Sequence, residues 1–147
     1  MLHHRPIIII DDDQDDRDML GTIVNDLQIT NEVIFLHDGK SAFEYLKTME
    51  SPAALIICDI NMPKMNGFQL KREINKDPGL NVKCVPFFFL TTTVSKQAAE
   101  EAYSLGVQGF YVKESSFDGM TDVVKYMLEF SKHGIFPKDL EDGRLNN

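Results

Sequence analysis

The chain has 147 residues, 43% of them hydrophobic, and a formal net charge of -8 at pH 7. This length predicts a single domain, with enough apolar content for one core and no room for a second folded domain. The acidic balance disfavours direct binding to nucleic acid, because contact with a phosphate backbone needs clustered Lys and Arg.

The two cysteines and the N-terminal segment indicate the compartment. Cys58 lies inside an apolar run, so it and Cys84 do not suggest the disulfide framework of a secreted protein. Residues 1–6 hold no apolar stretch of signal-peptide length, and no apolar run is long enough to cross a bilayer. We therefore expect a cytoplasmic protein without membrane insertion.

Five short runs rich in β-branched and aromatic residues predict β-strands. They occupy residues 7–10, 33–36, 55–58, 85–90 and 110–112. Their apolarity is nearly continuous rather than alternating, which is typical of a parallel sheet covered by helices on both faces.

Helical patterns separate the strands. Five apolar residues share one helical face, and three more form a shorter stripe: Met19, Leu20, Ile23, Val24 and Leu27, then Ala42, Phe43 and Leu46. Further helices are predicted at 68–76, 95–105 and 117–132, with a connection at 77–83 that carries a Pro78-Gly79 turn. Alternating strands and helices predict a doubly wound α/β fold.

The C-terminal segment breaks the helical pattern at Gly134 and Pro137. We therefore expect one domain over residues 1–133 and a short, frayed, polar tail over 134–147, with no effector domain.

Polar residues stand where four of the predicted strands end. Asp11, Asp12 and Asp13 follow the first strand, Asp59 ends the third, Thr91 follows the fourth and Lys113 ends the fifth. Because ligands of doubly wound folds bind beyond the carboxyl ends of the strands, these residues are expected to converge on one rim.

The residue types at this rim indicate phosphoryl chemistry. Asp11, Asp12 and Asp59 would repel one another without a counter-charge, and Mg²⁺ prefers such oxygen ligands. An aspartate beside the cation can attack phosphorus and form an acyl phosphate, and Asp59 is the candidate. A hydroxyl and an ammonium group would stabilise the transferring phosphoryl group, and Thr91 and Lys113 suit those roles.

Four segments, IIIIDDDQDDR, LIICDINMPKMNG, PFFFLTTT and GFYVK, resemble the receiver domain of bacterial response regulators in order and approximate spacing. The resemblance spans roughly residues 6 to 132 and implies a flavodoxin-like, five-stranded sheet of order 2-1-3-4-5. The NKDPGL segment, the LTTT run and Lys113 without a following proline are similar to the small response regulators paired with bacterial phytochromes.

The resemblance also implies roles for individual residues. Asp12, the Asp59 carboxylate and the main-chain carbonyl of Asn61 would bind Mg²⁺ directly, with Asp11 acting through a water molecule. Thr91 would move toward the phosphoryl group and Lys113 would contact it. Phe110 is expected to be the aromatic switch residue coupled to Thr91.

The same resemblance implies partners. A sensor histidine kinase or phosphotransfer protein would phosphorylate Asp59. A downstream protein or a second copy of the chain would dock on the face built from the fourth helix, the fifth strand and the fifth helix. We expect a self-catalysed phosphorylation switch rather than an enzyme with a separate substrate.

One departure from the family concerns the residues after the fifth strand. Receivers usually carry Lys-Pro there, often with a cis peptide, whereas this chain reads Lys113-Glu114-Ser115. A cis bond before Glu114 would be costly, so the local turn is expected to differ.

Two other functions compete with the receiver interpretation. Asp11 and Asp13 form the DxD of a haloacid-dehalogenase-like phosphatase, although a hydroxyl residue is missing near Asp15 and no cap domain is available. A phosphorylation-independent, receiver-like interaction module normally lacks an acidic residue or the lysine, and none is missing here. Asp13, Asp15 and Asp16 are interpreted as residues that cap the following helix and complement its dipole.

Overall fold

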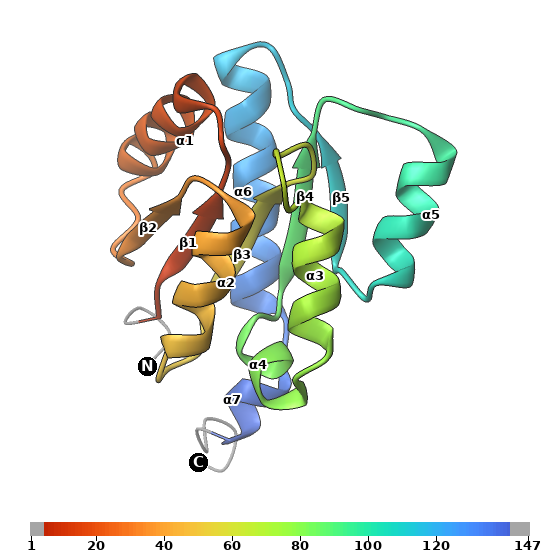
Figure 1. Cartoon of the computed structure of the whole chain (residues 1–147). Helices are drawn as coiled ribbons and strands as arrows, with labels where there is room; N and C mark the ends of the chain where they lie inside the picture. The colour runs from red at the N-terminus through yellow and green to blue at the C-terminus, as the bar shows by residue number, and fades with distance from the viewer. Residues whose placement is uncertain (1–4, 142–147) are drawn as a thin grey trace.

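A computed structural model describes residues 5–141 and shows one five-stranded parallel sheet between two layers of helices (Figure 1). The strand order is β2-β1-β3-β4-β5, which confirms the order that the resemblance to receiver domains implied. The strands are β1 (Ile7–Ile10), β2 (Val33–Leu36), β3 (Leu55–Asp59), β4 (Phe87–Thr91) and β5 (Gly109–Val112).

Two apolar cores lie on opposite faces of the sheet. Alternate strand residues point to opposite sides, so Ile8 and Phe87 belong to one core and Ile7 and Phe88 to the other. The helices α2 (Gly39–Thr48), α3 (Gly67–Asn75) and α5 (Lys96–Ser104) supply the first core, and α1 (Gln14–Asp26) and α6 (Phe117–His133) supply the second. This burial on both faces explains the continuous apolarity of the strand sequences.

The segment predicted as a connection at 77–83 contains a short helix, α4 (Pro78–Lys83). Asp77 is the N-cap and accepts a hydrogen bond from the Leu80 amide, while Pro78 occupies the first helical position. Proline is favoured there because its fixed φ suits a helix start, so Pro-Gly was wrongly interpreted as a turn. The predicted fourth and fifth helices are consequently α5 and α6.

The prediction of a frayed C-terminal segment is wrong for residues 136–141. Phe136 is buried, α7 (Pro137–Glu141) follows it, and Lys138 and Asp139 are almost inaccessible to solvent. The Lys138 ammonium donates to the main-chain carbonyls of Ala53 and Ala54, just before β3. The rest of the predicted tail, 142–147, lies outside the described residues.

Within residues 5–141, none of the helices combines the length and apolarity that a membrane crossing requires.

Candidate functional site

The predicted rim is formed at the carboxyl ends of four strands. Asp11 directly follows β1, Asp59 and Thr91 are the last residues of β3 and β4, and Lys113 directly follows β5. The ladder between β3 and β4 pairs Asp59 with Leu90, and that between β4 and β5 pairs Thr91 with Val112. The parallel register therefore brings residues from across the chain to the same edge.

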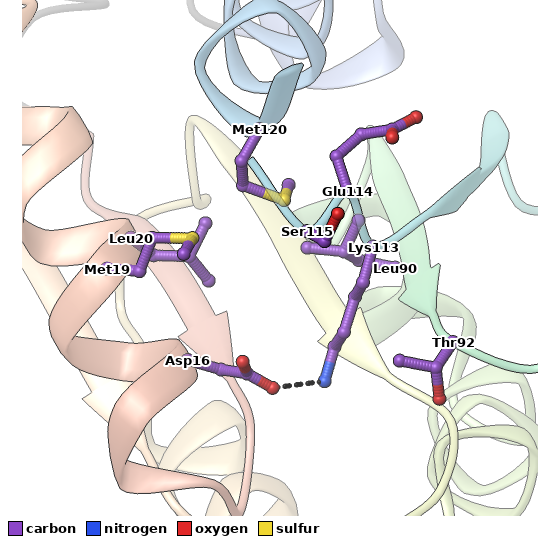
Figure 2. A pocket seen from close by; sticks show the side chains of 9 residues that line it. All are labelled: Asp16, Met19, Leu20, Leu90, Thr92, Lys113, Glu114, Ser115 and Met120. Atoms are coloured by element: carbon purple, nitrogen blue, oxygen red, sulfur yellow. Dashed lines mark hydrogen bonds and ion pairs between the residues drawn. The ribbon is translucent and has the colours of Figure 1, made fainter. Parts of the chain in front are cut away.

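Lys113 is the positive centre of this edge. Its Nζ atom lies 2.7 Å from Asp16 Oδ2, 3.0 Å from Asp11 Oδ2 and 3.3 Å from Asp59 Oδ2. Figure 2 shows the ammonium group reaching across a cavity toward Asp16 in α1. The sequence predicted the meeting of Lys113 with Asp11 and Asp59, but it did not predict the contact with Asp16.

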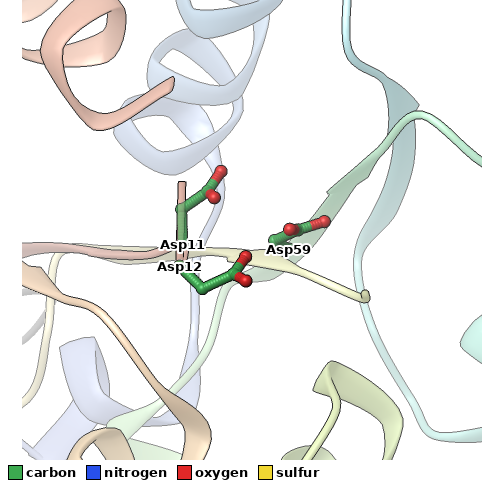
Figure 3. A group of neighbouring side chains, drawn as sticks. All are labelled: Asp11, Asp12 and Asp59. Carbon is green, nitrogen blue, oxygen red and sulfur yellow. The ribbon is translucent and has the colours of Figure 1, made fainter. Parts of the chain in front are cut away.

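The three predicted metal-binding carboxylates, two after β1 and one at the end of β3, gather at this edge of the sheet (Figure 3). One oxygen of each of Asp11, Asp12 and Asp59 lies within 4.8 Å of the others. Asp11 and Asp59 are buried, with 2% and 6% exposure, whereas Asp12 is exposed. The cluster therefore has a buried base and one carboxylate that faces solvent.

Burial governs the charge state of the site. Loss of hydration raises the pKa of Asp59 to about 6, although Lys113 acts against the increase. Burial likewise raises the pKa of Asp11, opposed by hydrogen bonds from the Asp13 amide and Lys113. Burial alone would lower the pKa of Lys113, but Asp16, Asp59 and Asp11 together raise it above its ordinary value. Lys113 is therefore fully charged at neutral pH.

The donor set suits a hard divalent cation. Three carboxylates within reach of one another offer only oxygen ligands, and Lys113 supplies a single positive charge against them. Because two of the carboxylates are buried, a second positive charge would relieve their repulsion. The arrangement therefore fits a divalent cation that prefers oxygen ligands.

The loop after β3 is held close to Asp59. The backbone amide of Asn61 hydrogen-bonds the Asp59 carboxylate, and the Gly67 amide donates to the Ile60 carbonyl at 2.8 Å. Gly67 begins α3 in tight contact with β3, because a Cβ atom there would lie 2.4 Å from the Asp59 carbonyl oxygen. Glycine is thus required sterically for the Asp59 backbone to keep its place.

We therefore expect Gly67→Ala to lower the free energy of unfolding by about 1–2 kcal/mol, because the added methyl group overpacks rigid backbone. The measurement is chemical denaturation, with Gly79→Ala as control, since a Cβ atom at Gly79 would meet only the Asp77 side chain at 3.4 Å. Equal stability of the two variants would contradict the steric account.

Thr91 and its neighbours form the opposite side of the site. Thr91 is fully buried, and its hydroxyl oxygen accepts from the Thr93 amide at 3.1 Å. The Asn61 side-chain amide donates to the Thr93 hydroxyl at 2.8 Å, which links the loop after β3 to the loop after β4. Asn61 thus contributes a side-chain contact beside the main-chain role that the resemblance implied.

The residues at the start of α1 have two different environments. Asp13 is the N-cap and accepts from the amides of Asp15 and Asp16, as predicted. Asp16 differs, because its carboxylate pairs with Lys113 across 97 residues of sequence. The sequence does place Asp16 three residues after the N-cap. Side chains at that position fold back toward the start of the helix, and this could have indicated a role for Asp16 at the rim.

The peptide after β5 has an ordinary geometry in this chain. Within residues 5–141 the cis peptide bond is Val85–Pro86, so Lys113–Glu114 is trans, in line with the cost of a cis bond before a residue other than proline. Phe110 on β5 is partly buried and packs against the core beneath α5. Phe110 is thus an aromatic residue of β5, where the resemblance put the switch residue. Its switching role stays a prediction.

A comparison with models of known protein families shows to which family the chain is related. The model of the response regulator receiver domain matches residues 7–125, which include all four strand-end residues of the site. The chain belongs to this family. It is therefore a receiver domain of two-component signalling, a family whose members generally act as switches.

Individual relatives support this membership. The chain is 27% identical to response regulator Rcp1 of Synechocystis over 129 residues, which cover 84% of the chain and 86% of Rcp1. The structure of the phosphorylated cyanobacterial phytochrome response regulator RcpA matches with a TM-score of 0.81 and 26% identity, over 91% and 99% of the two chains. The structure of Mn²⁺-bound Rcp1 matches with a TM-score of 0.78 and 25% identity, over 90% and 99%. The expected similarity to phytochrome-associated regulators is thus confirmed.

The phosphatase alternative loses its basis at Asp13. In that interpretation Asp11 and Asp13 act together, but the Asp13 side chain is used to cap α1. The family match points in the same direction.

Proposed function

We propose that this receiver domain accepts a phosphoryl group on Asp59 in a reaction that depends on Mg²⁺. The observation that carries the proposal is the convergence of Asp59 with two further carboxylates and the Lys113 ammonium group at one edge of the sheet. A sensor histidine kinase or a phosphotransfer protein would be the donor.

Asp12, the Asp59 carboxylate and the Asn61 main-chain carbonyl would hold the cation, with Asp11 acting through a water molecule. The cation supplies charge neutralisation for the attacking carboxylate and the phosphoryl oxygens. The Mn²⁺ in the related Rcp1 structure supports a divalent cation here.

The chain's own groups provide the rest of the chemistry. An Asp59 oxygen bonds to phosphorus while the bond from phosphorus to the donor group breaks, and the donor leaves with that electron pair. Charge spreads over the three phosphoryl oxygens in the transition state, so a fixed ammonium group is effective there. Lys113 is already 3.3 Å from Asp59 Oδ2, and the Thr91 hydroxyl would supply a further donor. The domain thereby modifies itself and turns over no separate substrate.

The output face would be built from α5, β5 and α6. Tyr103 on α5 and Val112 on β5 are large apolar residues exposed there, which favours docking of a protein partner or a second copy of the chain. In this proposal Thr91 and Phe110 transmit the change from the site to that face.

The test is incubation of the purified chain with acetyl phosphate and Mg²⁺, followed by intact mass. We expect one added phosphoryl group, which is absent when the metal is removed with EDTA. Failure to label under any of these conditions would instead support the phosphorylation-independent interaction module.

Thr91→Ala is expected to retain labelling, at a reduced rate, but to lose the response of the output face. The reason is that the hydroxyl group is the part of the switch that contacts the phosphoryl group directly. The measurement is the change in amide hydrogen exchange over α5, β5 and α6 upon labelling. Thr92→Ala, which alters the exposed neighbour, is the matched control and should respond like the wild type. A full response in Thr91→Ala would refute this role.

A further inference from the structure

We propose that Asp16 is a positioning residue for Lys113 and keeps its ammonium group aimed at Asp59 when the other carboxylates are committed to the metal. This inference rests on the proposed function and assigns a task to a residue in α1. It is carried by the contacts of Lys113, by the capping of α1 and by the charge balance of the site.

The first observation is the shortest contact of the Lys113 ammonium group. Asp16 Oδ2 lies 2.7 Å from Nζ, nearer than the oxygens of Asp11 at 3.0 Å and Asp59 at 3.3 Å. An ammonium group has three donors, so these three carboxylates match its full capacity. Charge-assisted hydrogen bonds of this length are among the strong ones.

The second observation is that the start of α1 does not need the Asp16 side chain. Asp13 caps the helix by accepting from the amides of Asp15 and Asp16. The amide of Asp13 itself, which an acidic residue at the position of Asp16 often binds, donates instead to Asp11 Oδ1 at 2.9 Å. The Asp16 carboxylate is thereby left to bind Lys113.

The third observation is the charge balance after the metal binds. Asp11, Asp12 and Asp59 form the group able to hold the cation, and Asp16 is outside that group. A cation bound by those three carboxylates would weaken their attraction for the ammonium group and would itself repel it. Asp16 is then the carboxylate in contact with Lys113 that does not bind the cation. The Asp16 contact therefore gains importance in the metal-bound state.

The surroundings of Lys113 give its ammonium group space to move. A cavity of about 260 Å³ lies between α1 and the start of α6, and both Asp16 and Lys113 border it (Figure 2). The lysine side chain is a flexible four-carbon stem, so packing alone does not fix the position of its ammonium group next to this cavity. The ion pair with Asp16 restrains the ammonium group on the side of this cavity.

The experiment compares Asp16→Asn with Asp15→Asn in the full chain. Both substitutions remove one negative charge from the first turn of α1, but Asp15 is exposed and accepts no contact from Lys113. We expect the initial rate of labelling by acetyl phosphate and Mg²⁺ to fall about 3- to 10-fold in Asp16→Asn, the size expected for weakening one charge-assisted hydrogen bond. Asp15→Asn should keep the wild-type rate, and Asp16→Glu should restore part of the loss.

A second readout does not depend on phosphorylation. In the Mg²⁺-loaded protein without a phosphodonor, the Lys113 ammonium group is expected to give an observable ¹⁵N NMR signal in the wild type and in Asp15→Asn. The signal should disappear in Asp16→Asn, because the ammonium group becomes mobile and exchanges its protons with water.

The outcomes separate this inference from the function on which it rests. Absence of labelling in the wild type would count against the proposed function, while the NMR comparison would still test Asp16. Equal labelling rates and an unchanged Lys113 signal in Asp16→Asn would overturn the positioning role and leave the proposed function standing.

Discussion

Asp139→Ala is expected to lower the free energy of unfolding by about 3–5 kcal/mol, the cost of breaking a buried ion pair from one side. Arg5 Nη1 donates to Asp139 Oδ1 at 2.8 Å, and the two side chains are only 5% and 1% exposed. The second oxygen, Oδ2, accepts from the Phe136 amide at 2.9 Å. Alanine would leave the Arg5 charge buried without this carboxylate and would also remove the acceptor of the Phe136 amide.

Urea denaturation of the variant and the wild type measures this loss. Leu140→Ala is the matched control, because Leu140 lies on the same helix and is 56% exposed; it should change the stability by no more than about 0.5 kcal/mol. The double variant Arg5→Met with Asp139→Leu should recover much of the loss, since it removes both buried charges. A loss below about 1 kcal/mol in Asp139→Ala would contradict the expected cost of breaking this buried ion pair from one side.

Asp59→Asn is expected to raise the stability of the metal-free protein at pH 7. Burial raises the pKa of the Asp59 carboxyl to about 6, so holding it ionised in the fold costs free energy. A shift of this size corresponds to at most about 3 kcal/mol. The neutral amide avoids this cost.

The pH dependence of this difference follows from the direction of the shift. The folded protein binds the Asp59 proton more tightly than the unfolded chain, so the wild type loses stability relative to the variant as the pH rises from about 4 to about 6. The advantage of Asp59→Asn should thus be absent below about pH 4 and complete above about pH 6.

Mg²⁺ should make the wild type more stable than Asp59→Asn, which reverses their order of stability in the metal-free state. A cation that binds the folded wild type stabilises it by mass action, and the variant lacks one of the proposed ligands. Thermal denaturation with EDTA and with saturating Mg²⁺, at pH 4 and pH 7, measures all four conditions. A wild type that is more stable than Asp59→Asn in EDTA at pH 7 would contradict the raised pKa, and an unchanged order in Mg²⁺ would contradict the metal site.

The sequence predicts the sheet and the strand-end residues because both follow from local rules. Asp59 and Lys113 stand at the ends of apolar runs, and parallel strands bring their carboxyl ends to the same edge whatever the details of packing. Pro78 shows the limit of such rules, since the Pro-Gly pair suits a helix start as well as a turn.

The missed features depend on contacts between distant residues. Asp16 meets Lys113 across 97 positions, and Arg5 meets Asp139 across 134. Lys138 appeared to belong to a solvated tail, yet its apolar stem is buried while its ammonium group reaches main-chain carbonyls. Composition describes such residues as polar, but only the folded chain shows which partners they have.

The central claim is that Asp59 carries the phosphoryl group, and chemical trapping tests it most directly. Protein labelled with acetyl phosphate and Mg²⁺ is treated with borohydride, which reduces an acyl phosphate to an alcohol, and the modified residue is located by peptide mass mapping. We predict reduction at Asp59 alone and no trapped product from Asp59→Asn. Reduction at Asp11, Asp12 or Asp13, or a product that survives Asp59→Asn, would contradict the account.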